Sequence, residues 1–314
     1  MACRVLVTGA TGRVGVVLVP VLAAKHFKPR LLVRDEGRAR RLFRGLDCEF
    51  VQADLLRSSF DDLVHACRGC CAVVHLAGSA DYSLSERDLV ALNYGGTERI
   101  VVAAKRAGVK RFVFLSSTSV YGARPRELPV TEKTRFSPSN AYGRSKLLAE
   151  YAVKRARIPF VILRPTVIYG PGFAAGFREV ARALVKGKMF LVGDGSNRVP
   201  LVHVDDVVQA IVLALKSGKL NEDYLIAGCE VLTQEQVLRM LARALKVLPP
   251  QKKIPKWLAL LLAGSAEKRE YVRVLAEDRV FSLDKAQKLL GFRPKRRLGV
   301  ELVKLVPFLL GGWR

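Results

Sequence analysis

Eight residues near the start of the chain, Thr8-Gly9-Ala10-Thr11-Gly12-Arg13-Val14-Gly15, decide the fold. They follow an apolar run at 3–7 that predicts a strand, and they lead into a run at 14–24 that predicts a helix. The glycines permit a tight turn, close approach of the backbone to a pyrophosphate, and close helix packing. The amino end of the helix adds N–H groups and a positive dipole for phosphates. This turn predicts a dinucleotide site with contacts at Gly9, Thr11, Gly12, Arg13, Val14 and Gly15.

Apolar runs alternate with helical patterns through the rest of the first half. Continuous apolar strands separated by helices predict a parallel sheet that is covered on both faces. We therefore expect an α/β fold: a Rossmann-like doubly wound parallel sheet with a smaller mixed, mainly helical C-terminal substrate lobe. The nucleotide-binding domain is expected at 1–165, with 201–228 returning to it, and the lobe at 166–200 and 229–314. Strands are predicted at 30–33, 49–52, 71–76, 111–115 and 160–163, and helices at 38–43, 59–67, 88–106 and 140–155.

The chain has 314 residues, half of them hydrophobic, and a formal net charge of +25. Its Lys and Arg are spread along the whole length, without zinc-finger spacing or an aromatic-rich RNA-binding signature, so we predict no specific nucleic-acid partner. No apolar stretch approaches the roughly 20 residues of a membrane-spanning helix. The apolar stretches at 257–263 and 302–313 could touch a membrane face peripherally, but packing within the C-terminal lobe is the favoured interpretation.

No secretory signal precedes the first strand, which predicts a cytoplasmic location and reduced thiols for all six cysteines. A cluster at 65–75 contains Cys67, Cys70 and Cys71 between two histidines. Part of that segment reads as a buried strand, and no second Cys-x-x-Cys completes a set of four ligands. We therefore predict no metal site.

Tyr142 and Lys146 are spaced so that they share one face of the predicted helix at 140–155. A positive charge beside a phenol lowers its pKa, which would allow Tyr142 to exchange a proton with a substrate hydroxyl or carbonyl. The pair alone is more typical of a half-buried tyrosine beside a solvated lysine, so a catalytic interpretation depends on the rest of the chain.

The second strand ends in Val33-Arg34-Asp35. An acidic residue at this tip would accept from the ribose hydroxyls of NAD, whereas an arginine suits the 2′-phosphate of NADP. Arg34 occupies the tip, so NADP(H) is favoured. NAD(H) is the alternative, because a shift of one residue would place Asp35 there.

The ordered motifs resemble those of the extended short-chain dehydrogenases/reductases, in the NAD-dependent epimerase/dehydratase superfamily, over nearly the whole chain. Beyond the glycine turn they lie at 54–55, 75–78, 93–97, 115–122, 142–146 and 163–172. The resemblance implies that Tyr142 is the acid/base, that Lys146 holds the nicotinamide ribose, and that Ser117 bonds the reacting oxygen. Thr118 is the alternative to Ser117. It also implies cofactor-binding positions at Asp54, Leu55, Leu76, Ala77, Gly78, Pro165, Thr166 and Val167, with Asn93 organising the structure beside the cofactor.

The resemblance leaves the reaction partly open. Dehydratases of the superfamily carry an acidic pair where this chain has Thr118 and Ser119, so a dehydratase is not expected. The favoured function is an NAD(P)-dependent oxidoreductase that transfers hydride at a hydroxyl or carbonyl carbon of a small molecule. The alternatives are an NDP-sugar 4-epimerase with tightly bound NAD and a non-catalytic NADP(H)-binding subunit. Substrate contacts are expected at Ser79, Thr118, Tyr121 and Arg198, the last for an anionic group, and a homodimer is expected through the helices at 88–106 and 140–156.

Overall fold

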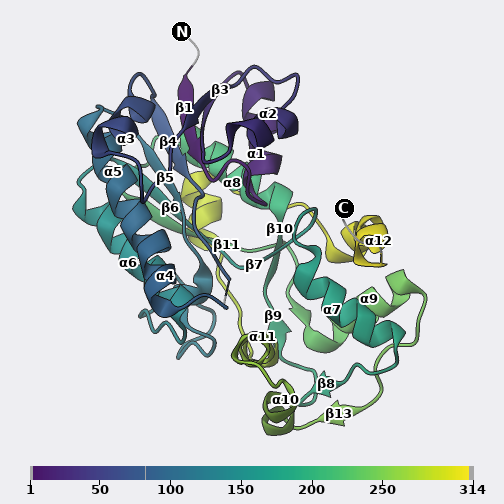
Figure 1. Ribbon diagram of the computed structural model, residues 1–314. Coiled ribbons are helices and arrows are strands. Elements are labelled where there is room, and N and C mark those ends of the chain that lie inside the picture. Colours follow the sequence, from purple (N-terminus) through teal and green to yellow (C-terminus); the bar gives the residue numbers. More distant parts are fainter. Residues whose placement is uncertain (1–2, 82, 311–314) are drawn as a thin grey trace.

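The computed structural model describes residues 3–81 and 83–310. Its centre is a parallel sheet of seven strands in the order β3-β2-β1-β4-β5-β6-β11 (Figure 1). This arrangement confirms the Rossmann-like sheet predicted from the alternation of strands and helices. The strands are β1 (Arg4–Thr8), β2 (Lys28–Val33), β3 (Glu49–Gln52), β4 (Ala72–His75), β5 (Phe112–Leu115), β6 (Phe160–Pro165) and β11 (Glu222–Ile226).

Helices cover both faces of the sheet because every strand is apolar on both sides. Along β1, Val5 and Val7 point into the core beneath one set of helices, and Leu6 points into the core beneath the other. The first set is α1 (Gly15–Ala24), α2 (Glu36–Leu42) and α8 (Val204–Lys216), and the second is α3 (Phe60–Cys67), α5 (Gly96–Arg106) and α6 (Ala141–Arg155).

The single helix predicted at 88–106 is divided in the structure. A π-helical turn at Ala91–Gly95 separates α4 (Glu86–Val90) from α5. The turn carries Asn93, whose side chain is 1% exposed. Such one-turn insertions often lie at functional sites, and hydrophobic periodicity does not resolve them.

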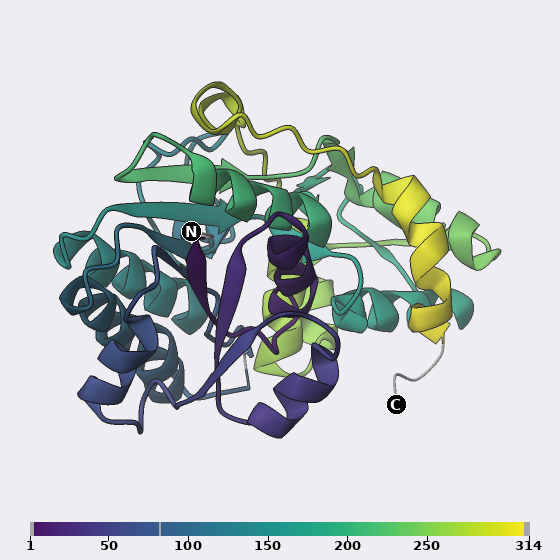
Figure 2. The ribbon, with the colours of Figure 1, turned by 90° about the horizontal axis from the view of Figure 1, so that it is seen from above.

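The C-terminal lobe contains a second core between three helices, which include Leu184, Leu241 and Leu302. Figure 2 shows yellow α12 beside the green and teal helices α9 and α7 at one side of the molecule. Three short strand pairs lie outside the seven-stranded sheet: β7 with β10, β9 with β12, and β8 with β13. The lobe elements are β7 (Val167–Tyr169), α7 (Ala174–Val185), β8 (Leu191–Val192), β9 (Arg198–Val199), β10 (Leu201–His203), β12 (Leu232–Thr233), α9 (Gln234–Leu245), β13 (Lys253–Ile254), α10 (Lys256–Leu262), α11 (Ala266–Ala276) and α12 (Leu298–Leu310).

The chain returns to the sheet after the first elements of the lobe. Strand β11 pairs with β6 at the sheet edge. The boundary predicted from the sequence left all of 229–314 in the lobe, but Ala286, Leu290 and Phe292 are buried in the same core as α8. The π-helical turn at Ala286–Leu290 lies between the lobe helices α11 and α12 in the chain and packs against α8.

Two cysteines depart from the expectation of reduced thiols. Cys3 and Cys71 form a disulfide, with their Cα atoms 5.8 Å apart. The pairing of β1 with β4 brings the two cysteines together, because Cys3 immediately precedes β1 and Cys71 immediately precedes β4. The other four, Cys48, Cys67, Cys70 and Cys229, are free.

Burial raises the pKa of Cys67 to about 12, which keeps this thiol protonated. Among the residues that the structure describes, no group of His, Cys, Asp and Glu side chains could hold a metal ion. Over the same residues, no helix is long and apolar enough to cross a membrane.

Candidate active site

The motifs singled out in the sequence meet at one edge of the sheet. The glycine turn follows β1, Arg34 follows β2, Asp54 follows β3, Leu76 follows β4 and Ser117 follows β5. All these strands are parallel, so their carboxyl ends lie at the same edge. This is where open α/β sheets bind ligands.

The glycine turn is shaped for close backbone approach. Gly9 has φ +69°, and a Cβ there would lie 2.7 Å from the backbone nitrogen of Ala77. A Cβ on Gly15 would collide with the carbonyl of Ala10. Helix α1 begins after Val14 without a side-chain cap and without an acidic residue in its first turn. Its amino end therefore fits the pyrophosphate of a dinucleotide.

Tyr142 lies in the first turn of α6. Asn140 begins this helix, with its Oδ1 accepting from the Gly143 backbone N–H at 2.7 Å. The absence of a side chain at Gly143 lets the helix approach the Ser119 carbonyl, which a Cβ would meet at 2.5 Å. This contact brings the loop after β5 against the helix, and the side chains of Ser117 and Tyr142 are hydrogen-bonded.

The pKa of Tyr142 shifts in the direction opposite to the sequence expectation. Burial raises it, and the hydrogen bond to Ser117 and the charge of Arg13 offset this only in part. The positive charge that acts on the phenol is Arg13, from the glycine turn, which also lies 4.9 Å from the centre of the Phe173 ring. Tyr142 is therefore a protonated phenol near neutral pH.

Lys146 follows Tyr142 by one turn on the same helix and is 5% exposed. Its Nζ lies 4.6 Å from the centre of the Phe114 ring. Burial lowers the pKa of Lys146 to about 8, against the opposing effect of Glu150. The ammonium thus stays largely charged at neutral pH although it is enclosed.

Two residues that the sequence reasoning missed support this helix. Glu150 is fully buried one turn beyond Lys146, and Arg164 of β6 contacts it at 2.7 Å. Ser116 donates to the same carboxylate at 2.6 Å, and Asp223 contacts Arg164 at 2.8 Å. Burial alone would lower the pKa of Arg164, but the hydrogen bonds and charge of Glu150 raise it. The spacing of 142, 146 and 150 is the sequence signal that could have indicated Glu150.

Two residues predicted to contact substrate have their hydroxyls engaged within the protein. Tyr121 is fully buried, and its hydroxyl accepts from Arg164 at 2.8 Å. Thr118 is 4% exposed, and its hydroxyl donates to the Pro165 carbonyl at 3.2 Å. Both lie in the turn after Ser117, where the chain folds back into the protein, which a linear motif does not reveal.

Asn93 links the loop after β4 to helix α6. Its Oδ1 accepts from the Ser79 N–H at 2.8 Å, and its Nδ2 donates to the Ser79 carbonyl and to Ser145 Oγ, both at 2.9 Å. Gly78 has φ +155°, and a Cβ there would lie 2.7 Å from Asn93 Oδ1. These contacts agree with the organising role expected for Asn93, and they place Ser79 beside Lys146's helix.

The remaining residues predicted to bind the cofactor also lie along this edge. Asp54 accepts from the Leu56 N–H at 2.7 Å and so shapes the turn at Leu55. The Thr166 hydroxyl is buried and has no hydrogen-bond partner within the described part of the chain. An orphaned hydroxyl next to Pro165 and Val167 fits the carboxamide of a nicotinamide.

Arg198, expected to meet an anionic substrate group, is already paired. Its Nε lies 2.8 Å from one oxygen of Asp278, and its Nη2 contacts the other. The pKa of Asp278 is lowered, first by this hydrogen bond. The bidentate pair neutralises the guanidinium, so Arg198 is a weaker anion site than its sequence context suggested.

Comparison with known proteins gives one consistent result. The family model described as "NAD dependent epimerase/dehydratase family" matches residues 5–227. A UDP-glucose 4-epimerase of Vibrio cholerae is 28% identical over 311 residues, covering 95% of this chain and 93% of that protein. The sterol-4-alpha-carboxylate 3-dehydrogenase, decarboxylating, of Bos taurus is 27% identical, covering 93% and 88%. The structure of MoeE5 in complex with UDP-glucose and NAD has a TM-score of 0.78 and 25% identity, covering 98% of this chain and 100% of that chain.

Proposed function

We propose that this chain, which belongs to the NAD-dependent epimerase/dehydratase family, uses its NAD(P)-dependent enzyme fold to reduce a carbonyl, or oxidise a hydroxyl, of a small molecule. The observation that carries the proposal is the hydrogen bond between Ser117 and Tyr142, with Lys146 one turn away, at the sheet edge that carries the glycine turn. A phenol held by a serine at this position can exchange a proton with a carbonyl or hydroxyl oxygen.

A nicotinamide bound at this site would supply or accept the hydride. Ser117 would hold the reacting oxygen by a hydrogen bond, and Tyr142 would give that oxygen its proton. In the opposite direction Tyr142 must first lose its proton, which the charges of Arg13 and Lys146 would assist. Glu150 and Arg164 do not reach the reacting atoms in this scheme; they hold α6 so that Tyr142 and Lys146 keep their positions.

A preference for NADP(H) is the finer part of the proposal. Arg34 is exposed directly after β2, where a 2′-phosphate would lie. The competing carboxylate of Asp35 is engaged, because its Oδ1 accepts from the Arg38 N–H at 2.8 Å and begins α2. This supports Arg34 as the residue that meets the ribose substituent.

Replacement of Arg34 by alanine is expected to weaken NADPH binding by about 10- to 100-fold, the loss of one charged hydrogen bond or pair. NADH affinity should change little. Arg41→Ala, on the exposed face of the neighbouring α2, is the matched control and should alter neither. Fluorescence titration of both reduced cofactors measures this. Tighter binding of NADH than NADPH by the unaltered protein would contradict the preference.

An NDP-sugar 4-epimerase with retained NAD is the second candidate, supported by the similarity to the epimerase of Vibrio cholerae. The pairing of Arg198 with Asp278 favours it less, because an epimerase needs cations for a diphosphate. Denaturing the purified protein and analysing the released nucleotide separates the two. Stoichiometric NAD and conversion of a UDP-sugar without added cofactor would replace the reductase proposal. Cofactor-free protein that oxidises added NADPH with a ketone substrate would support it.

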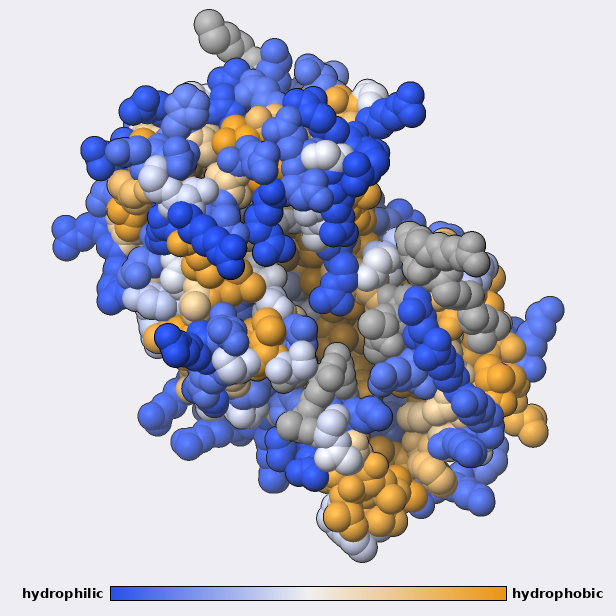
Figure 3. Space-filling model, in the orientation of Figure 1, coloured by the Kyte–Doolittle hydropathy of each residue, from blue (hydrophilic) through white to orange (hydrophobic). Residues whose placement is uncertain are grey.

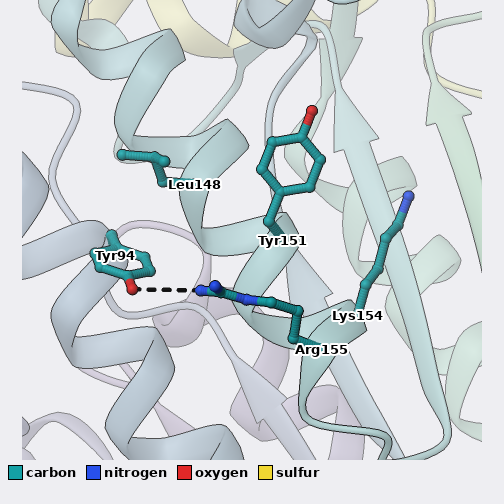
Figure 4. A pocket seen from close by; sticks show the side chains of 5 residues that line it. All are labelled: Tyr94, Leu148, Tyr151, Lys154 and Arg155. Carbon is teal, nitrogen blue, oxygen red and sulfur yellow. Dashed lines mark hydrogen bonds between the residues drawn. The ribbon is translucent and has the colours of Figure 1, made fainter.

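A homodimer through α5 and α6 and a cytoplasmic location complete the proposal. The outer surface of these helices has a hollow of about 590 Å³ lined by Tyr94, Leu148, Tyr151, Lys154 and Arg155 (Figure 4). Leu148 and Tyr151 are 40% and 45% exposed there. A second copy would cover this apolar surface, as expected for two helices meeting two helices.

Light scattering is expected to give twice the chain mass for the unaltered protein and the single mass for Leu148→Arg. The reason is that a buried charge without a partner opposes association. Leu42→Arg, at a leucine of similar exposure on α2, should stay dimeric. A monomeric mass for the unaltered protein would refute the dimer.

A further inference from the structure

Helix α10 leaves three large apolar side chains in solvent. Trp257 and Leu261 are each 67% exposed, and Leu262 is 65% exposed. Positions 257 and 261 share one face of the helix, while Ala259 is buried and attaches the helix to the lobe. In Figure 3 an apolar patch lies at the lower end of the molecule, where Figure 1 places α10. An exposed patch of this kind marks a surface that meets another apolar phase or partner.

A cavity of about 480 Å³ borders the same helix. Lys256 and Leu260 of α10 line it, together with Arg124, Arg126 and Arg273. One face of α10 thus borders a basic cavity, and the next face around the helix carries the exposed apolar side chains. Helix α10 therefore lies between a basic surface that attracts anions and an exposed apolar surface.

The cations of this face outnumber its anions. Glu277, the acidic residue that lines the cavity, is paired with Lys256. Arg124 and Arg126 have no ion-pair partner among the described residues. The chain as a whole carries a formal charge of +25. Further exposed cations follow and precede α10 in the sequence: Lys252, Lys253, Lys268 and Arg269.

We propose that this face binds the surface of an anionic phospholipid bilayer. Trp257, Leu261 and Leu262 enter the interface, and Arg124 and Arg126 contact lipid phosphates. An apolar edge beside a set of cations is the combination that holds amphipathic elements at a membrane surface. Three side chains fall well short of the roughly 800 Å² per partner that a stable protein interface buries, which favours a bilayer over a second copy. The proposal concerns where the enzyme works and is independent of its reaction.

Vesicle binding tests the proposal on the full chain. Sedimentation with vesicles of equal parts phosphatidylglycerol and phosphatidylcholine should remove the protein from solution at low salt, and vesicles of phosphatidylcholine alone should not. High salt should weaken the binding because it screens the lipid charge. The double variant Trp257→Ser/Leu261→Ser should lose at least about tenfold in vesicle affinity. Val300→Ser/Val303→Ser removes two apolar side chains that are 59% and 65% exposed on α12, and should bind as the unaltered protein does.

Tryptophan emission gives a second readout. The chain has two tryptophans, so Trp313→Phe leaves Trp257 as the sole reporter. Its emission should shift to shorter wavelength on addition of the anionic vesicles. Absence of binding to anionic vesicles at low salt, or equal loss in the α10 and α12 variants, would overturn the proposal. A halved mass of the α10 variant in light scattering would also overturn it, in favour of self-association.

Discussion

Tyr142→Phe is expected to lower kcat by about 100- to 10,000-fold, the range that a positioned general acid/base contributes. Cofactor affinity should remain nearly unchanged, because the ring stays in place and only the hydroxyl that Ser117 holds is lost. Steady-state kinetics with a ketone substrate, beside a cofactor titration of the same variant, measures both quantities. A catalytic role predicts this combination of a much lower kcat and an unchanged cofactor affinity.

Tyr224→Phe is the matched control for this change. The Tyr224 hydroxyl is buried without a hydrogen-bond partner in the described chain, on β11. Its removal should leave kcat and stability close to those of the unaltered protein. Full turnover by Tyr142→Phe in the same assay would refute the catalytic assignment. Cofactor binding without turnover in the unaltered protein, across a broad substrate panel, would instead favour the non-catalytic subunit.

Arg164→Leu is expected to lower the free energy of unfolding by roughly 3–5 kcal/mol, the cost of leaving a buried charge without its partner. Glu150 is fully buried, and of the hydrogen bonds that its carboxylate accepts from Arg164 and Ser116 it would keep only the one from Ser116. Chemical denaturation measures the loss. Because α6 also carries Tyr142 and Lys146, the folded variant should show reduced kcat as well.

Replacing both partners separates the lost charge pair from the lost packing. Glu150→Leu/Arg164→Leu leaves no buried carboxylate unpaired, so it should recover part of the stability that Arg164→Leu loses. Arg239→Leu, at an exposed arginine on α9 that pairs with Glu235 at 2.7 Å, should cost little. A double variant no more stable than Arg164→Leu would show that packing, rather than the buried charge, sets the loss.

The fold could be predicted because its signals are local. Strands β1, β4, β5 and β6 contain continuous apolar runs, and turn glycines and helix periodicity separate the strands. The π-helical turn at Asn93 was not predicted, since one inserted residue leaves the apolar periodicity on both sides nearly intact. The short strand pairs of the lobe could not be predicted either. A strand of two residues, such as Arg198 and Val199, is too short to show an alternating hydrophobic pattern.

The candidate site shows which properties a sequence motif predicts and which it does not. Ser117, Tyr142 and Lys146 could be identified by their order and spacing. The direction of the Tyr142 pKa could not, because burial by residues distant in sequence outweighs the nearby charges. Tyr121 and Thr118 were assigned to substrate although their hydroxyls face the interior. The supporting role of Glu150 and Arg164 was not predicted, because it depends on a contact between α6 and β6 that the sequence does not show.

A structure of the protein with bound NADP(H) tests the central claim most directly, since it needs no knowledge of the substrate. The pyrophosphate should lie against Gly12 and Val14, and the nicotinamide should lie between Lys146 and Thr166. Its C4 should face Tyr142 across a space where a carbonyl carbon could approach to within about 3.5 Å. A cofactor bound elsewhere, or a nicotinamide turned away from Tyr142, would contradict the account.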